Sequence, residues 1–431
     1  MKQFIPLYFI LTLLLVVGTL LHKKDFERVY EKIDDTVLPN PINLLLSNDL
    51  SDLEETKQME KYVENFLRQW EITGASLAVM KNGKLLYSKG FGYADKEMGV
   101  ETDVKHIFRI ASVSKLITAV AVMRLAEEGL LGLNDKVFGE EGILCDSLYL
   151  AAITDRRVKN ITVDHLLRHR AGYTLRAGDP VFSPLDVAAR MKFPLPITTE
   201  NLVQYAAASR LATNPGNSNI YSNLGYVVLG KIIEKVSGMN YEDYVQEKVL
   251  HPAGCYDMHM GHIYYSEKFP NEVRYYEPSD AEPIRPFDGS DGLEPRRYGG
   301  NDISLVGAAG GWVASPVEIL KLVAAIDPES GTTGILSQKS VTAMTRYAKD
   351  VYPIGWIKVT EGGDWLRTGS LAGTSALLKR ERDGYTWMFV TNTSSWTGSR
   401  FTSKIEAMMK EAIKKVESWP ERDMFLTQNA N

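Results

Sequence analysis

The amino-acid sequence predicts a mixed α/β fold of the α+β type, an antiparallel sheet flanked by helices with an all-helical lobe inserted into it. Two observations lead to this prediction. Short apolar runs typical of strands occur at 74–92 and again at 352–394, whereas the long middle of the chain is largely helical in its periodicity. When strands from both ends of a chain share one sheet, the intervening helices form flanking layers or an inserted lobe.

The predicted strands are short and are separated by turn residues. The first two are joined at Asn82-Gly83, the strongest signal for a hairpin in a short stretch of sequence. Four more are predicted near the carboxyl end, at 352–360, 364–369, 374–384 and 385–394. We therefore expect one sheet built from both ends of the chain.

Helical periodicity predicts most of the remaining elements. The segment 58–70 is amphipathic, with its apolar residues on one face. Further helices are predicted at 112–128, 162–169, 198–209, 222–236, 241–250, 315–326, 337–347 and 401–417. Two long segments, 173–196 and 266–302, are expected to be loops that shape specificity.

The chain divides into four predicted segments. Residues 4–21 carry no charge and are just long enough to cross a bilayer as a helix, so 1–24 is predicted to be a signal peptide or a membrane anchor. Either alternative delivers the rest of the chain outside the cytoplasm, to the periplasm or the cell surface. The other segments are a linker at 25–58, a folded domain at 59–420 with its helical lobe at roughly 130–300, and a tail at 421–431.

Composition excludes several classes of function. With 44% hydrophobic and 24% charged residues in 431 positions, the chain is typical of a globular protein. Its net charge of -5 and its scattered lysines and arginines argue against nucleic acid as a partner. Cys145 and Cys255 are expected to be buried thiols, with one disulfide bridge as the alternative. His165 and His169 have metal-ligand spacing but no evident third ligand, so we expect structural roles and no metal.

The segment 109–131 reads RIASVSKLITAVAVMRLAEEGLL and places Ser112 and Lys115 at the start of an apolar helix. Positions i and i+3 share a helix face, so the Lys115 amine can reach the Ser112 hydroxyl. A serine hydroxyl becomes a nucleophile when a base takes its proton, and desolvation lowers the pKa of a lysine enough for it to be that base. The unpaired N–H of the first turn favours a developing oxyanion. The alternative is a capping serine beside a lysine that extends to solvent.

A second motif, at 221–223, follows further along the chain. A polar loop there delivers Tyr221 and Asn223 to the start of a predicted helix. A phenol close to the Lys115 ammonium has a lowered pKa and can accept a proton. The Asn223 amide can hold a substrate carbonyl and also contact Lys115. The alternative is a loop tyrosine whose hydroxyl only satisfies a buried partner.

A third motif ends a predicted edge strand at Arg367-Thr368-Gly369. Gly369 has no side chain, so it allows a substrate backbone to approach closely. The N–H of Ser370 is then placed to be the second oxyanion donor, opposite that of Ser112.

Together, the S-x-x-K, Y-x-N and R-T-G motifs resemble those of the serine beta-lactamase and penicillin-binding-protein family, in its branch of class C beta-lactamases, D,D-carboxypeptidases and esterases. The resemblance extends from about residue 60 to residue 415 and includes GASLAVMKNGKLLYSKGFGYAD, ITVDHLLRHRAGY and GAAGGWVAS. It implies a beta-lactamase/transpeptidase-like fold with the site between a sheet domain and a helical domain. It also implies that Ser112 is acylated, that Lys115 and Tyr221 move protons, and that no cofactor is required.

The resemblance implies hydrolysis of cell-wall peptides ending in D-alanyl-D-alanine or of beta-lactams, with esters and D-amino-acid amides as alternative substrates. Arg367 departs from the family pattern, which has lysine or histidine at that position. Arginine stays protonated and cannot transfer protons, but it can hold a positive field on Tyr221 and Lys115, and its planar fork suits a substrate carboxylate. The alternative is that Arg367 forms an inward salt bridge and the site is impaired. In that case the chain would be a noncatalytic, membrane-anchored sensor or wall-binding protein.

Overall fold

The computed structural model describes residues 38–176 and 178–429, and Asn40 begins the second of its two units. The segment 1–24, predicted to be a signal peptide or an anchor, lies outside the described residues. Among the helices that are described, none has the length and the apolar character that crossing a membrane requires.

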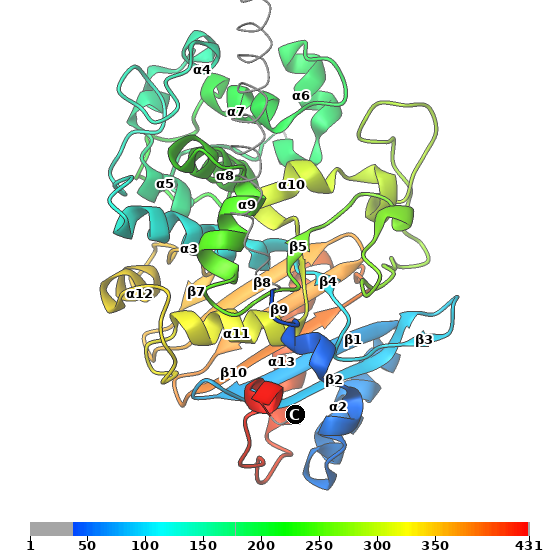
Figure 1. Cartoon of the computed structure of the whole chain (residues 1–431). Coiled ribbons are helices and arrows are strands. Elements are labelled where there is room, and N and C mark those ends of the chain that lie inside the picture. Colours follow the sequence, from blue (N-terminus) through cyan, green and yellow to red (C-terminus); the bar gives the residue numbers. More distant parts are fainter. Residues whose placement is uncertain (1–37, 177, 430–431) are drawn as a thin grey trace, which may run out of the picture. The chain divides into compact units, whose positions relative to one another are not determined.

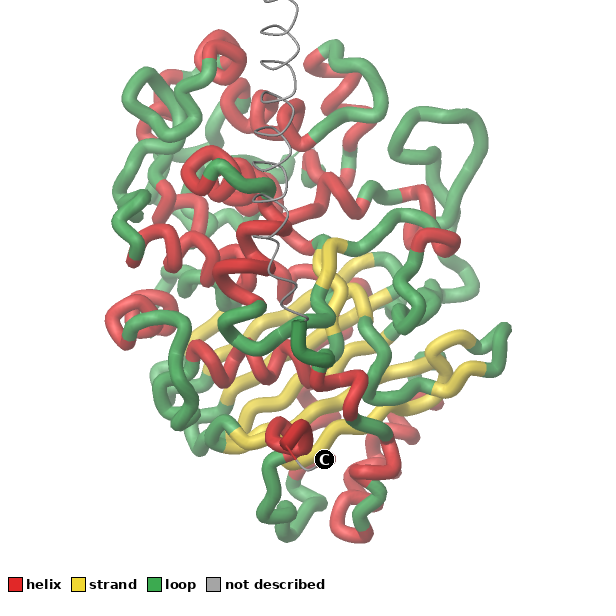
Figure 2. The backbone as a smooth tube through the Cα atoms, in the orientation of Figure 1, coloured by secondary structure: helices red, strands yellow, loops and turns green. Residues whose placement is uncertain are grey.

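Seven of the described strands form one antiparallel sheet, in the order β3-β2-β1-β10-β9-β8-β7. Their bounds are β1 (Gly74–Lys81), β2 (Lys84–Asp95), β3 (Val100–Glu101), β7 (Lys358–Val359), β8 (Trp365–Leu371), β9 (Thr374–Arg380) and β10 (Tyr385–Thr391). Because β1 pairs with β10, strands from the two ends of the chain meet in the middle of the sheet. Figure 2 shows this sheet below the helical part of the chain, and the predicted fold class is confirmed.

The hairpin between β1 and β2 turns at Asn82-Gly83, as the sequence predicts. The φ angles of these residues are 47° and 76°. A two-residue turn in which both φ angles are positive matches the right-handed twist of the flanking strands. This local preference is therefore sufficient to explain where the first two strands join.

Helices cover both faces of the sheet (Figure 1). α2 (Lys57–Gln69) and α13 (Phe401–Ile413) pack on the face that carries Leu77 of β1. α11 (Pro316–Ile326) contacts β1 and β10 on the opposite face, which carries Ala78. Successive residues of a strand point to opposite faces, so an apolar strand buried on both sides is expected here.

The remaining helices come from the middle of the chain, and most of them gather beyond one side of the sheet in Figure 1. They are α3 (Ser114–Glu127), α4 (Ser147–Ala152), α5 (Val163–Leu167), α6 (Pro184–Met191), α7 (Thr199–Ala208), α8 (Asn223–Ser237), α9 (Tyr241–Val245), α10 (Ile303–Gly310) and α12 (Gln338–Thr345). A small second sheet in the described part of the chain has the order β4 (Phe108–Arg109), β6 (Trp312–Ala314), β5 (His259–Met260).

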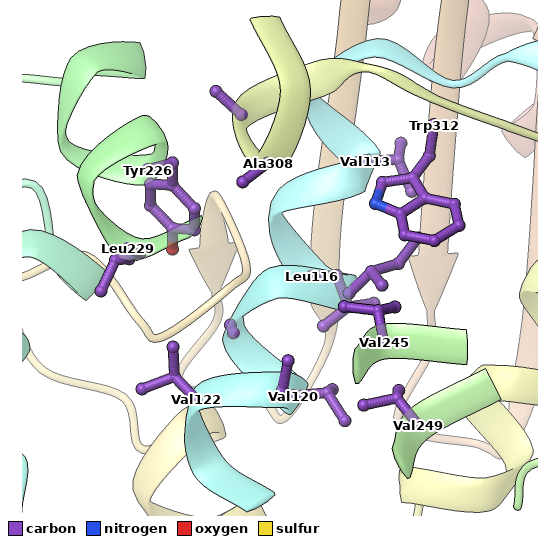
Figure 3. Close-up of a cluster of buried hydrophobic side chains, with 14 of the residues drawn as sticks. Val113, Leu116, Val120, Val122, Tyr226, Leu229, Val245, Val249, Ala308 and Trp312 are labelled. Atoms are coloured by element: carbon purple, nitrogen blue, oxygen red, sulfur yellow. The ribbon is translucent and has the colours of Figure 1, made fainter. Parts of the chain in front are cut away.

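Helix α3 lies at the centre of this helical part. Its residues 114–123 and Leu125 are buried, and it contacts α8, α9 and α10. Figure 3 shows its apolar side chains against those of the neighbouring elements, among them Val113, Leu116, Val120, Val122, Tyr226, Leu229, Val245, Val249, Ala308 and Trp312. A helix that is apolar on all sides is stable only when it is enclosed, so α3 provides a rigid base for the residues at its start.

The structure differs from the predicted domain bounds at both ends. Residues 42–45 and 48–51 form 3-10 turns that pack on the domain, although 25–58 was expected to be a linker. Asn43 is buried and its Nδ2 donates to Asp257 Oδ2 at 2.6 Å. At the other end Met424 is buried within the expected tail. Elements of four residues are too short to show a helical period, so the sequence pattern did not predict them.

Two further predictions need correction. The segment 173–196, expected to be a loop, contains the helix α6, which begins at Pro184 and ends at Met191. Of the two cysteines, Cys255 is buried as expected, but Cys145 is exposed, and both are free thiols.

Candidate active site

Ser112 stands at a sharp turn directly before α3. Residues Ala111–Val113 form a single 3-10 turn and the α-helix begins at Ser114, so Ser112 precedes the helix rather than occupying its first turn. Ala111 has a φ of 48°, a left-handed conformation that costs a non-glycine residue about 1–2 kcal/mol. Because α3, α10 and β8 all contact this turn, the surroundings hold the strained backbone and orient the serine.

Two polar groups contact the Ser112 hydroxyl, one from the next turn of the chain and one from a distant segment. Lys115 Nζ lies 3.0 Å from Ser112 Oγ, and the Tyr221 phenol oxygen lies 2.9 Å from it. Tyr221 comes from the loop before α8, where the N-cap Ser222 accepts a hydrogen bond from the Gly225 N–H. The hydroxyl, the amine and the phenol are therefore close enough for direct proton transfer.

Lys115 is fully buried, and its amine faces three acceptors. Besides Ser112 Oγ, these are Asn223 Oδ1 at 2.7 Å and the Ala309 carbonyl oxygen at 2.5 Å. An ammonium group has three N–H donors, so each can be matched to one acceptor. Burial lowers the pKa of Lys115 to about 8. The charge of Arg367 also lowers this pKa, whereas Tyr221 raises it.

Arg367 contacts both Ser112 and Tyr221. Its Nε donates to the Ser112 carbonyl oxygen at 2.7 Å, and its Nη2 donates to the Tyr221 oxygen at 3.0 Å. Burial raises the pKa of Tyr221, but the positive charges of Arg367 and Lys115 outweigh it and lower that pKa to about 8. The arginine therefore stabilises a negative charge on the phenol, a role that needs no proton transfer by Arg367 itself.

Of the roles expected for Arg367, this placement matches the positive field on Tyr221 and Lys115, but neither the contact with a substrate carboxylate nor the inward salt bridge. The side chain is 0% exposed, so its fork does not present itself to a substrate carboxylate. Within residues 38–176 and 178–429 its partners are a carbonyl oxygen and a phenol, not a carboxylate, so it forms no inward salt bridge either.

A pocket of about 420 Å³ opens onto the reacting groups. It is lined by Ser112, Tyr221, Asn223, Tyr352, Ile357, Thr368, Gly369, Ser370, Ser399 and Thr402. The predicted site residues are thus brought together, with Lys115 and Arg367 buried behind the lining rather than within it.

Strand β8 brings Thr368, Gly369 and Ser370 to the pocket. β7 pairs only with Trp365 and Leu366, so in the described part of the chain the rest of β8 has a strand partner on one edge, β9. Such an edge can accept an extended substrate backbone. The sequence therefore placed the third motif correctly at a strand edge, although the need for glycine there has a different cause.

Gly369 is required by a close approach within the protein itself. A Cβ at this position would lie 2.3 Å from the Ile110 carbonyl oxygen and 3.2 Å from the Ser112 nitrogen. The glycine was expected to make room for a substrate backbone, but it makes room for the turn that carries Ser112. Because Gly369 has no side chain, β8 can approach this turn closely, and Ser370 and Ser112 lie at the same end of the pocket.

Replacing Gly369 with alanine is expected to lower both stability and turnover. The added Cβ meets backbone atoms that cannot rotate away, so β8 and the Ser112 turn must separate. We expect a loss of about 1–3 kcal/mol in the free energy of unfolding, as in other overpacked sites. Denaturant unfolding measures the first effect, and the rate of Ser112 acylation in the folded fraction measures the second. If the free energy of unfolding and the acylation rate were both unchanged, the contact between Gly369 and the Ile110 carbonyl would not be tight.

Asp179 also belongs to this site, although it was not among the predicted residues. Its Oδ2 accepts a hydrogen bond from Asn223 Nδ2 at 2.6 Å. This bond fixes the amide so that Asn223 Oδ1 faces Lys115. Asp179 also caps a 3-10 turn by accepting from the Val181 N–H. An Asp-Pro pair in a loop is an ordinary turn signal, so the sequence offered no sign of the contact to Asn223.

Replacing Asp179 with alanine is expected to lower kcat about tenfold or more, because the Asn223 amide loses the partner that orients it. Asp179→Asn keeps an acceptor oxygen and is expected to restore most of the rate. Asp186→Ala, which removes a carboxylate of α6, is the matched control. If kcat were equal in all three variants, Asp179 would not help to position Asn223 and Lys115.

His169, for which a structural role was expected, packs against the phenol of Tyr221. Its ring centroid lies 4.3 Å from that of Tyr221, and its Nδ1 accepts from the Ser222 N–H at 3.2 Å. Burial, together with the charges of Arg367 and Lys115, holds the pKa of His169 well below its ordinary value. The neutral ring thus supports Tyr221 without adding charge.

His165 lies in a capping box with Thr162 at the start of α5, so its contacts are local and structural. Across the described ranges, histidine, cysteine, aspartate and glutamate side chains form no group of three or more that could hold a metal ion.

Comparison with known proteins places this site in a family. The profile of the Beta-lactamase family matches residues 59–407. Protein flp of Staphylococcus aureus strain N315 is 27% identical over 239 residues, which are 54% of this chain and 43% of that protein. Penicillin-binding protein 4* of Bacillus subtilis strain 168 is 29% identical over 223 residues, which are 51% of this chain and 44% of that protein. The chain thus spans less than half the length of these relatives.

A solved structure shows the same fold over a longer stretch. The D-amino acid amidase of Ochrobactrum anthropi SV3, complexed with L-phenylalanine amide, superimposes with a TM-score of 0.64 at 22% identity. The match covers 85% of this chain and 100% of the amidase. With a family match across most of the chain, and with S-x-x-K, Y-x-N and R-T-G motifs meeting in one pocket, the chain belongs to the Beta-lactamase family.

Proposed function

We propose that the chain is a serine hydrolase that cleaves amide or ester bonds through an acyl-enzyme on Ser112. The observation that carries the proposal is the contact of Ser112 Oγ with both Lys115 Nζ and the Tyr221 oxygen. Ser112 Oγ therefore contacts both a base and a cation, which are the groups that nucleophilic attack of a serine on a carbonyl requires.

Tyr221 is the better candidate for the base. The Lys115 ammonium is matched to three acceptors, which favours its charged form. The Tyr221 oxygen accepts from Arg367, which favours a tyrosinate. In the proposed reaction the Ser112 proton passes to the Tyr221 oxygen as Ser112 Oγ bonds to the carbonyl carbon. Tyr221 then gives this proton to the leaving amine or alcohol as that bond breaks.

Deacylation reverses the roles. A water molecule gives a proton to Tyr221 and attacks the acyl carbon, and Ser112 Oγ regains a proton as it leaves. The backbone N–H groups of Ser112 and Ser370 are proposed to hold the oxyanion in both steps, because Gly369 brings the two residues to one end of the pocket.

The preferred substrates are proposed to be D-alanyl-D-alanine peptides or beta-lactams. Besides Ser112 and two tyrosines, four residues with hydroxyl side chains line the pocket, at Thr368, Ser370, Ser399 and Thr402. Hydroxyls can donate to a substrate carboxylate, and the buried charges of Lys115 and Arg367 give the pocket a positive field. We further propose that the uncharged segment 4–21 directs the protein out of the cytoplasm and tethers it to the membrane.

A second candidate is the hydrolysis of neutral amides or esters, including D-amino-acid amides. The residues that line the catalytic pocket include no lysine or arginine, and Arg367 is buried. When an uncharged leaving group fills a pocket that has no cation at its surface, no charged side chain of the protein is buried without a partner.

A panel of substrates tests the proposal. The full-length protein is incubated with a fluorescent penicillin, a peptide ending in D-alanyl-D-alanine, the same peptide as its carboxyl-terminal amide, and a short-chain ester. Hydrolysis of the free carboxylate peptide, or labelling by the penicillin, supports the first candidate. Turnover of only the amide and the ester supports the second. If none of the four reacts, the fold serves a noncatalytic sensor or wall-binding protein.

A further inference from the structure

A second pocket, of about 690 Å³, adjoins the catalytic one. The two share the segment 221–224. Tyr221 and Asn223 line the catalytic pocket, whereas Ser222 and Leu224 line the second. A volume of this size is typical of small-molecule sites.

Three arginines from separate segments converge on this second pocket. Arg176 comes from the loop after α5, Arg190 from α6, and Arg210 from the loop after α7. No aspartate or glutamate is among the lining residues, and within the described ranges none of the three guanidinium groups has a carboxylate within salt-bridge distance. Other arginines of the chain, such as Arg157 and Arg380, are paired with carboxylates. Three unneutralised cations that line one pocket favour the binding of an anion there.

Two tyrosines line the pocket beside these arginines. Tyr173 lines it and is 4% exposed, and in the described part of the chain its hydroxyl has no hydrogen-bond partner. An unsatisfied buried hydroxyl costs about 1–3 kcal/mol. Tyr205, also in the lining, accepts a hydrogen bond from Arg190 Nη1 at 3.1 Å, which holds that arginine at the pocket.

We propose that this pocket binds a small molecule that carries at least two carboxylate or phosphate groups. Each guanidinium can bind such a group through two parallel hydrogen bonds. The anionic groups come either from the acyl part of the substrate of Ser112 or from a separate anion. In both cases the binding site is the same, and its occupation can be measured without reference to the proposed function.

Calorimetric titration of the full chain with citrate tests the site. Wild type is expected to bind with a dissociation constant of about 1 mM or lower. Arg210→Gln and Arg176→Gln are expected to weaken binding at least tenfold. These arginines are exposed, so the substitutions leave the fold intact. Arg382→Gln, in the turn between β9 and β10, removes the same charge elsewhere and is expected to bind as wild type does. Absence of binding to wild type, or equal affinity in all variants, would overturn the proposal.

Kinetics with citrate present separate the two sources of the anion. Competitive inhibition of hydrolysis by citrate, lost in Arg210→Gln, shows that the acyl part of the substrate reaches the pocket. A change in kcat without competition shows that a separate anion binds there. If hydrolysis itself is absent, the titration still decides the binding site, so the failure of the proposed function and the failure of this proposal remain distinguishable.

Discussion

Ser112→Ala is expected to lower turnover by about 10⁴-fold or more, because no other group stands where Ser112 Oγ meets both Lys115 and Tyr221. The substitution removes one half-buried hydroxyl at the pocket and is expected to leave the free energy of unfolding nearly unchanged. The measurement is the hydrolysis rate of the substrate that wild type turns over fastest, with the fold monitored by circular dichroism.

Ser114→Ala is the matched control for this prediction. Ser114 lies two residues further along and is buried, and its Oγ accepts from the Trp312 N–H at 3.2 Å. Its replacement is expected to cost about 1–3 kcal/mol of stability while leaving the rate of the folded protein nearly intact. A Ser112→Ala protein that kept its rate, or a Ser114→Ala protein that lost it while folded, would contradict the assignment of the nucleophile.

Tyr221→Phe is expected to lower the rates of acylation and deacylation by about 10²–10⁴-fold, the range for loss of a general base. The phenyl ring keeps its packing on His169, so substrate binding is expected to change little. Tyr352→Phe is the control, because Tyr352 also lines the pocket, with its ring centroid 6.4 Å from that of Tyr221. If turnover by Tyr221→Phe equals that of wild type, Tyr221 has no part in proton transfer.

The pH dependence of acylation follows from the same pair of groups. The pKa values of Tyr221 and Lys115 are both lowered to about 8. Below this range the phenol holds its proton and cannot accept another, so the rate rises with pH. Above it Lys115 loses the charge that stabilises the tyrosinate, so the rate falls. Wild type is therefore expected to show a bell-shaped profile centred near pH 8 with both limbs belonging to the coupled pair, and Tyr221→Phe is expected to lose the rising limb.

The sequence was sufficient for the fold class and for the groups that meet at Ser112. Hairpin residues, strand runs at both ends and an apolar helix are local signals, and each was read from a few neighbouring residues. The motifs of 112–115, 221–223 and 367–369 could be assigned because their residue types carry specific chemistry. In each case the information lies in the residues themselves rather than in their packing.

What the sequence did not show depends on tertiary contacts. The positive field of Arg367 on Tyr221 was expected, but its burial was not, because it follows from hydrogen bonds to the Ser112 carbonyl and the Tyr221 oxygen. The need for glycine at 369 comes from the Ile110 carbonyl, which is 259 positions away in the sequence. Asp179 was hidden because its partner Asn223 lies 44 residues further along the chain. Such pairings follow no local pattern, so they become visible only in the folded chain.

The central claim is that the Ser112 hydroxyl is the group that becomes acylated. Its most direct test is intact-protein mass spectrometry after exposure to a penicillin, followed by mapping of the modified peptide. The account predicts one adduct per chain, equal in mass to the intact penicillin, on the peptide that contains Ser112, formed fastest near pH 8. An adduct located on any other residue would contradict it.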